Sequence, residues 1–137
     1  MQIHEVILNK ILNGLPITSL LMSRFGEAKR ILETNNDIIT IFLKENFVPE
    51  EIIRYFLERK EKYTSLIGTN DVRSETSMVQ EKGVKIITIT DSNYPLQLRQ
   101  IPNPPLVLYV KGNIGFDYNK SIAIVGTRNA SSYAKKK

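Results

Sequence analysis

Residues 84–90 read VKIITIT, a run of β-branched side chains that follows Gly83 and ends at Asp91. Such residues favour the extended backbone of a strand. Upstream of this run the apolar residues recur at helical spacing, whereas downstream they occur in short continuous blocks. We therefore expect a helical first half and a strand-containing second half, in a fold between the α+β and α/β classes.

Two more strands are expected after the first. Pro104 and Pro105 force the chain into an extended entry to residues 106–110, LVLYV. Residues 121–125, SIAIV, are almost wholly apolar, and such a run is typical of a strand that is covered on both faces within a parallel sheet. A brief helical turn is predicted near residues 96–101.

The first 80 residues predict short helices separated by turn signals. Asn13-Gly14 ends the first helix, Thr18 can cap the second, and Gly26 offers the left-handed position at its end. Asn35-Asn36-Asp37 makes a turn and a cap, and Pro49 suits the first turn of a helix. Helices this short must pack on one another, so we expect a small bundle.

Composition excludes several classes of chemistry. The 137 residues contain no cysteine, which removes disulfides, thiolate metal sites and cysteine nucleophiles and fits a reducing compartment. The single histidine, His4, has no second histidine with which to share a metal or complete a triad. No metal or cofactor is expected. The apolar runs are far too short to span a membrane and no signal peptide is visible, so we expect a soluble, cytoplasmic protein.

The net charge of +5 lies in the second half of the chain. Residues 1–80 carry ten Lys or Arg against eleven Asp or Glu, whereas residues 81–137 carry nine against three. An anionic partner is therefore suggested for the second half, although a solvated basic tail at Lys135, Lys136 and Lys137 would produce much of the same asymmetry.

A candidate anion site follows the third predicted strand. Gly126 allows close approach of a ligand to the backbone, and the next residues look like a turn that enters a helix, whose first amides would be unpaired donors. Arg128 adds a planar fork matched to phosphate oxygens, and Thr127 or Ser131 can donate a hydroxyl. Taken alone, this pattern also occurs by chance.

The order of motifs makes the pattern more specific. Residues 94–113, YPLQLRQIPNPPLVLYVKGN, are followed by IAIVGTRNASSY from Ile122. In content and spacing the two segments resemble the signature of the DNA-processing protein A (DprA/Smf) family. The preceding EKGVKIITITDSNYP resembles that family's entry strand, and the helical first half is similar to its small sterile-alpha-motif-like (SAM-like) module.

The resemblance implies a binding protein rather than an enzyme. Members of the family coat incoming single-stranded DNA and help to load the RecA recombinase during natural transformation. Their DNA site lies in an extended Rossmann-like domain, at the turn that Gly126, Thr127, Arg128 and Ser131 match. By resemblance, these four residues are the expected phosphate contacts, and Lys135, Lys136 and Lys137 add unspecific attraction.

The resemblance also divides the chain and marks its departures from the family. Residues 1–70 would form the helical SAM-like module, and residues 71–137 the beginning of the Rossmann-like domain. Ala134 stands where the family pattern has glycine. Because the chain ends at Lys137, the rest of the sheet and the family's dimer surface are expected to be missing and DNA binding to be impaired.

Two alternative hypotheses remain open from the sequence. The turn at Gly126 could hold the phosphate of a nucleotide in a Rossmann-like enzyme, which would need a carboxylate near the site. The second half offers only Glu81, Asp91 and Asp117 for that role, and they show no paired spacing. Alternatively, only the first 70 or so residues fold, as a helical protein-interaction module.

Overall fold

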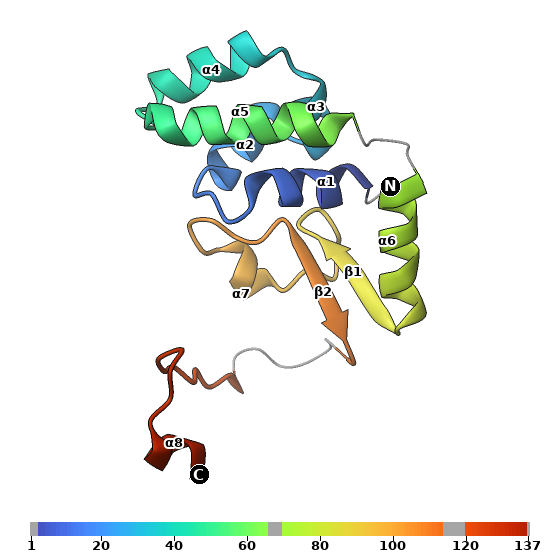
Figure 1. The fold of residues 1–137 in the computed structure, drawn as a ribbon, viewed down its shortest axis with the longest axis vertical. Helices are drawn as coiled ribbons and strands as arrows, with labels where there is room; N and C mark the ends of the chain where they lie inside the picture. Colours follow the sequence, from blue (N-terminus) through green and yellow to red (C-terminus); the bar gives the residue numbers. More distant parts are fainter. Residues whose placement is uncertain (1–2, 66–69, 114–119, 137) are drawn as a thin grey trace.

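The computed structural model describes residues 3–65, 70–113 and 120–136. It combines a group of helices with a two-stranded sheet (Figure 1). The elements are, in chain order, α1 (Ile3–Leu12), α2 (Thr18–Phe25), α3 (Ala28–Glu33), α4 (Asn36–Glu45), α5 (Glu50–Thr64), α6 (Asn70–Glu81), β1 (Val84–Thr88), α7 (Leu96–Arg99), β2 (Val107–Lys111) and α8 (Ser132–Lys136). This mixed content agrees with the α+β class expected from the sequence.

Helix α1 is the centre of the structure. It contacts α3 and α5 on the helical side, and it contacts α6 and β2 on the other side. The buried apolar side chains form one cluster, to which α1 contributes Val6, Ile7, Leu8, Ile11 and Leu12. Helices of 6 to 15 residues gain their stability from such shared burial rather than from intrinsic propensity. The small bundle expected from the sequence is therefore present.

Most of the predicted helix ends are found where the turn signals stand. Gly26 follows α2 with φ 83° and donates its backbone N–H to the carbonyl of Met22 over 2.8 Å. The side chain of Asn35 accepts the backbone N–H of Asp37 at 2.7 Å and so caps α4. The prediction for Thr18 was wrong. Thr18 is the first residue of α2 and makes no capping bond, because the chain turns into the helix one residue earlier.

The two strands pair with each other in antiparallel orientation. Ile86 lies opposite Tyr109, and Thr88 lies opposite Val107. Ile86 and Val107 are buried in the same cluster as the residues of α1, so one core continues from the helical part into the sheet. The division of the chain near residue 70 stays a prediction, but the described parts on either side of it share their apolar contacts.

The third strand was predicted wrongly. Residues 121–125 form no strand in the described structure, and their apolar side chains lie in solvent: Ile122, Ile124 and Val125 are 88%, 96% and 92% exposed. A strand is defined by hydrogen bonds to a neighbour, and within the described residues β1 pairs only with β2. The apolar composition of this segment favours a strand, but among the described residues no neighbouring strand pairs with it.

Two cations of α5 connect the helices to one another. The Arg59 guanidinium donates to the carbonyls of Lys10 and Ile11, at 2.6 and 3.0 Å, and therefore caps the end of α1. Lys60 is buried and donates from Nζ to the Thr34 carbonyl and to Asn36 Oδ1, at 2.9 and 2.7 Å. Burial lowers the pKa of Lys60 from its ordinary value.

Candidate nucleic-acid interface

The residues expected to contact phosphate all lie on the surface. Gly126, Thr127, Arg128 and Ser131 are exposed, in a stretch that begins at residue 120 and ends in α8. A methyl group added at Gly126 would meet no atom within 4 Å, so a ligand could approach the backbone there. The segment is therefore accessible to a large anionic partner.

The arrangement of these residues differs from a strand-turn-helix cradle. Because residues 121–125 form no strand, Gly126 does not stand at the carboxyl end of a sheet. The Thr127 hydroxyl donates to the carbonyl of Asn129 at 2.9 Å, which tightens the turn around Arg128. Helix α8 begins at Ser132, and the N–H of Lys135 bonds to the Ser131 carbonyl at 3.1 Å. The structure thus provides the turn and a short helix but no strand beneath them.

All of the charged side chains in this segment are basic. Lys120, Arg128 and Lys135 are exposed, and the sequence from residue 120 to 137 contains no Asp or Glu. Lys136 and Lys137 belong to the same stretch of sequence, although the side chain of Lys136 and all of Lys137 lie outside what the structure describes. Cations without interspersed carboxylates attract a polyanion over a distance comparable to the Debye length.

Other conspicuous residues of the second half have structural roles. Tyr94 is 3% exposed, and its hydroxyl donates to the Pro105 carbonyl at 2.7 Å. Burial raises the pKa of this hydroxyl, and the nearby Arg99 opposes the shift. Pro104 is buried as well. Tyr109 is 47% exposed on β2. Of these motif residues, Tyr94 and Pro104 shape the loop before β2.

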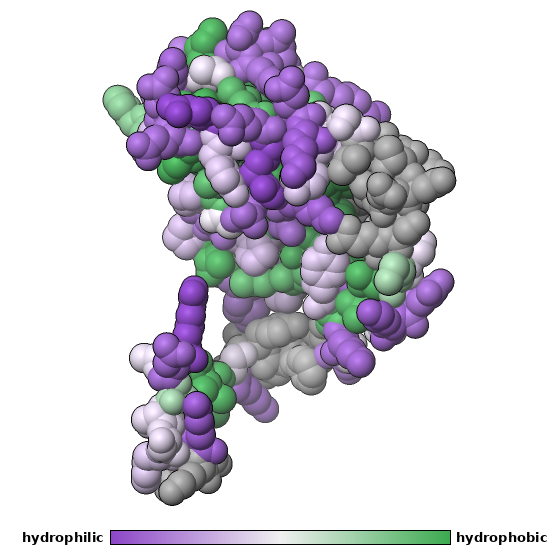
Figure 2. Space-filling model, viewed as in Figure 1, coloured by the Kyte–Doolittle hydropathy of each residue, from purple (hydrophilic) through white to green (hydrophobic). Residues whose placement is uncertain are grey.

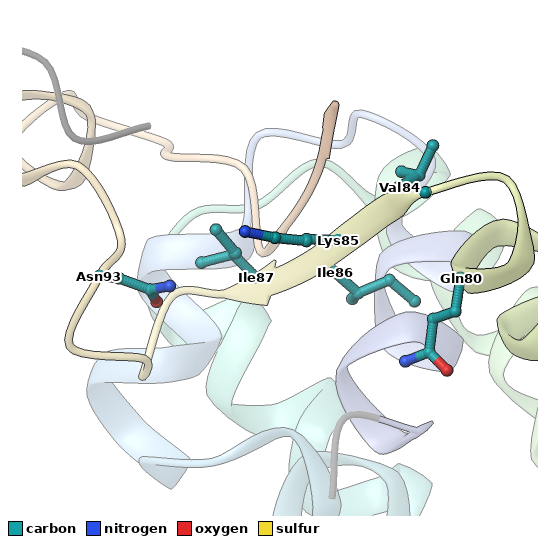
Figure 3. Close-up of a pocket in the computed structure, with 7 residues that line it drawn as sticks. Gln80, Val84, Lys85, Ile86, Ile87 and Asn93 are labelled. Atoms are coloured by element: carbon teal, nitrogen blue, oxygen red, sulfur yellow. The ribbon is translucent and has the colours of Figure 1, made fainter. Parts of the chain in front are cut away.

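A shallow hollow beside β1 was not predicted from the sequence. It is lined from α6 by Gln80, from β1 chiefly by Lys85, Ile86 and Ile87, and from the following loop by Asn93 (Figure 3). Lys85 and Ile87 extend from one face of the strand, and Ile86 extends from the other (Figure 3). No local pattern could have indicated this hollow, because α6 and the loop meet only through the fold.

The described residues contain no metal-ligand cluster and no membrane-spanning helix. Among them, no three His, Asp or Glu side chains come together as metal ligands. No helix in the described ranges has both the length and the apolar character needed to cross a membrane. The exposed basic segment from residue 120 onward is thus the most distinctive candidate for a functional surface.

Comparison with known proteins relates this same segment to DNA processing. Residues 85–137 match the family model described as DNA recombination-mediator protein A. The chain is 40% identical over 57 residues to the DNA processing protein DprA of Bacillus subtilis (strain 168), across 41% of this chain and 19% of that protein. It is 27% identical over 106 residues to Protein Smf of Borreliella burgdorferi, across 77% of this chain and 33% of that protein. The matched regions thus cover a third or less of each relative, and no solved structure matches.

Proposed function

Because residues 85–137 belong to the DNA recombination-mediator protein A (DprA/Smf) family, we propose that this chain binds single-stranded DNA. The proposal depends on two properties that occur together in one segment, the family match and an exposed basic surface. The region that matches the family ends in an exposed stretch from residue 120, and that stretch contains five Lys or Arg side chains and no carboxylate. A polyanion is the natural partner for such a surface.

In this proposal, the turn at residues 126–131 grips phosphates of the DNA backbone. Arg128 makes the strongest contact, because its planar guanidinium can bind two phosphate oxygens at once. The backbone at Gly126 approaches a phosphate closely, and the hydroxyls of Thr127 and Ser131 donate to its oxygens. Lys135, Lys136 and Lys137 add attraction that is independent of the nucleotide sequence.

The proposed role is binding rather than catalysis. DNA held in this way would be presented to a RecA-type recombinase during recombination or natural transformation, and no covalent step is assigned to the chain. The Rossmann-like character of residues 71–137 and the SAM-like character of residues 1–70 belong to the same proposal. The family match at residues 85–137 supports the Rossmann-like part, and the short helices between residues 3 and 64 support the helical part.

The test is a salt titration of binding to a fluorescein-labelled oligo-dT. If all five cations from residue 120 onward contact phosphate, the slope of log K against log salt is about −3.5, since each contact on a single strand contributes roughly −0.7. Arg128→Ala should reduce that slope by about 0.7 and weaken binding roughly tenfold. Arg54→Ala, an exposed arginine on α5, is the matched control. Equal slopes and affinities for the two variants would refute the assignment of Arg128.

A further inference from the structure

A small cavity lies where the helical part of the chain meets the loop before β2. The turn between α1 and α2 and this loop run side by side in Figure 1. The Ser19 hydroxyl donates to the Pro102 carbonyl, which holds the loop against the start of α2. The cavity has a volume of about 220 Å³. The residues that line it come from both parts of the chain and include Asn9, Leu15, Thr18, Asn103, Pro104 and Pro105.

Three polar side chains of this cavity are available to a ligand. Thr18 is only 8% exposed, yet its hydroxyl makes no hydrogen bond to any residue that the structure describes. The side-chain amides of Asn9 and Asn103 likewise make no hydrogen bond within the described ranges. A buried hydroxyl without a partner lowers stability, so its presence in a native fold calls for an explanation. A bound molecule that accepts a hydrogen bond would provide one.

The cavity also lies beside the N-terminal end of α2. Thr18, the first residue of this helix, lines the cavity, and the preceding Ile17 supplies no side-chain cap. The first hydrogen bond of the helix runs from the N–H of Leu21 to the Ile17 carbonyl, so the amides before Leu21 have no partner within the helix. Together with the helix dipole, these amides favour an oxygen atom that carries partial negative charge.

The composition of the walls determines the kind of ligand. None of the described residues that line the cavity is charged, so a phosphate or an ammonium group would lack a counter-charge there. Leu15, Pro104 and Pro105 supply apolar walls. In Figure 2, strongly hydrophilic side chains gather over α4 and α5, and more apolar ones appear where the helices meet the strand-containing part. The volume is below the roughly 300 to 1,000 Å³ of sites for drug-sized ligands. A single neutral ring with carbonyl oxygens and N–H groups suits such a cavity.

We propose that the cavity binds one pyrimidine base of single-stranded DNA, an inference that rests on the proposed function. The Thr18 hydroxyl and the first amides of α2 donate to a carbonyl oxygen of the base. The amides of Asn9 and Asn103 pair with the remaining polar edge, since each offers both a donor and an acceptor. Leu15 and Pro104 cover the faces of the ring.

This contact would join the two parts of the chain in one DNA-binding surface. Asn103 belongs to residues 85–137, which match the family and also contain the proposed phosphate contacts at residues 126–131. Asn9 and Thr18 belong to the helical part. The helical part would therefore hold a base of the strand, and it would add a preference for pyrimidines to binding that otherwise depends on phosphates.

Binding of two matched oligonucleotides tests the proposal. The wild type should bind oligo-dT more tightly than an abasic strand with the same number of phosphates. Thr18→Val keeps the shape of the side chain, and because the hydroxyl has no partner to lose, Tm should not fall. Thr18→Val and Asn103→Ala should each weaken oligo-dT binding about fivefold and leave abasic binding and the salt slope unchanged. Gln100→Ala, at an exposed amide outside the cavity, is the control and should bind both strands as the wild type does.

A titration with thymidine separates the cavity from strand binding. In ¹H–¹⁵N NMR spectra, the backbone amides of Thr18 and Asn103 should shift with thymidine at concentrations on the order of 10 mM, and less so in Thr18→Val. Thymidine shifts without any oligonucleotide binding would support the cavity and refute the proposed function. Oligo-dT binding without thymidine shifts, or variants that weaken oligo-dT and abasic binding equally, would overturn the base site and leave the assignment of Arg128 standing.

Discussion

Replacing Arg59 by methionine should destabilise the fold although the residue is far from the proposed DNA-binding segment. The guanidinium donates to two carbonyls in the last turn of α1, those of Lys10 and Ile11. It also lies over the rings of Tyr55 and Tyr63, at 5.3 and 5.1 Å from their centroids. Methionine keeps the length and apolar character of the stem but removes the charge and both hydrogen bonds.

The magnitude follows from these contacts. Hydrogen bonds from a charged group contribute about 1.5 to 3 kcal/mol, a cation at a helix end about 0.3 to 1, and each stacked ring about 0.5 to 1. These terms share one side chain and are not additive, and Arg59 is only half-buried, so we expect a total loss of about 2 to 3 kcal/mol. For a chain of 137 residues this lowers Tm by about 8 to 12 °C.

Thermal unfolding followed by circular dichroism measures this loss. Arg54→Met on the same helix is the control, since Arg54 is exposed; it should change Tm by roughly 2 °C or less. Arg59→Lys should recover only part of the loss, because an ammonium group cannot reproduce the planar fork that reaches two carbonyls. Melting temperatures of Arg59→Met and Arg54→Met within about 2 °C of each other would show that these contacts do not stabilise the fold, because a change of that size is expected of the control alone.

The remaining predictions concern single residues. Gly26→Ala should lower the free energy of unfolding by about 1 kcal/mol, because φ is 83° at Gly26. Gly126→Ala, with open space around the added methyl group, should leave Tm unchanged and weaken oligo-dT binding. The pKa of Lys60 is lowered in the folded chain, so the unfolded chain binds more protons as the pH approaches 10.5. The free energy of unfolding should therefore rise as the pH approaches 10.5, and Lys60→Met should abolish that rise in urea titrations. Tyr94→Phe removes the hydrogen bond from the buried Tyr94 side chain to the Pro105 carbonyl, and should lower the free energy of unfolding by about 1 kcal/mol in the same assay.

The sequence identified the segment that holds the candidate site, but it did not predict the structure of that segment. The order of Gly126, Thr127, Arg128 and Ser131 after an apolar run identified the segment, and the family match of residues 85–137 covers it. The predicted strand beneath the turn was wrong, because β-branched composition favours an extended backbone but cannot supply the neighbour that makes a strand. Which phosphate contacts these residues make stays a prediction.

By itself, the sequence determined several local elements of this protein. Helical spacing, Gly26, Asn35 and the β-branched run at residues 84–90 act within a few residues, so they could be read directly. Only the tertiary structure decided that β1 and β2 pair in antiparallel register against α1, that Arg59 and Lys60 connect helices, and that residues 121–125 stay uncovered. Those outcomes depend on contacts between segments far apart in the chain, which no local pattern encodes.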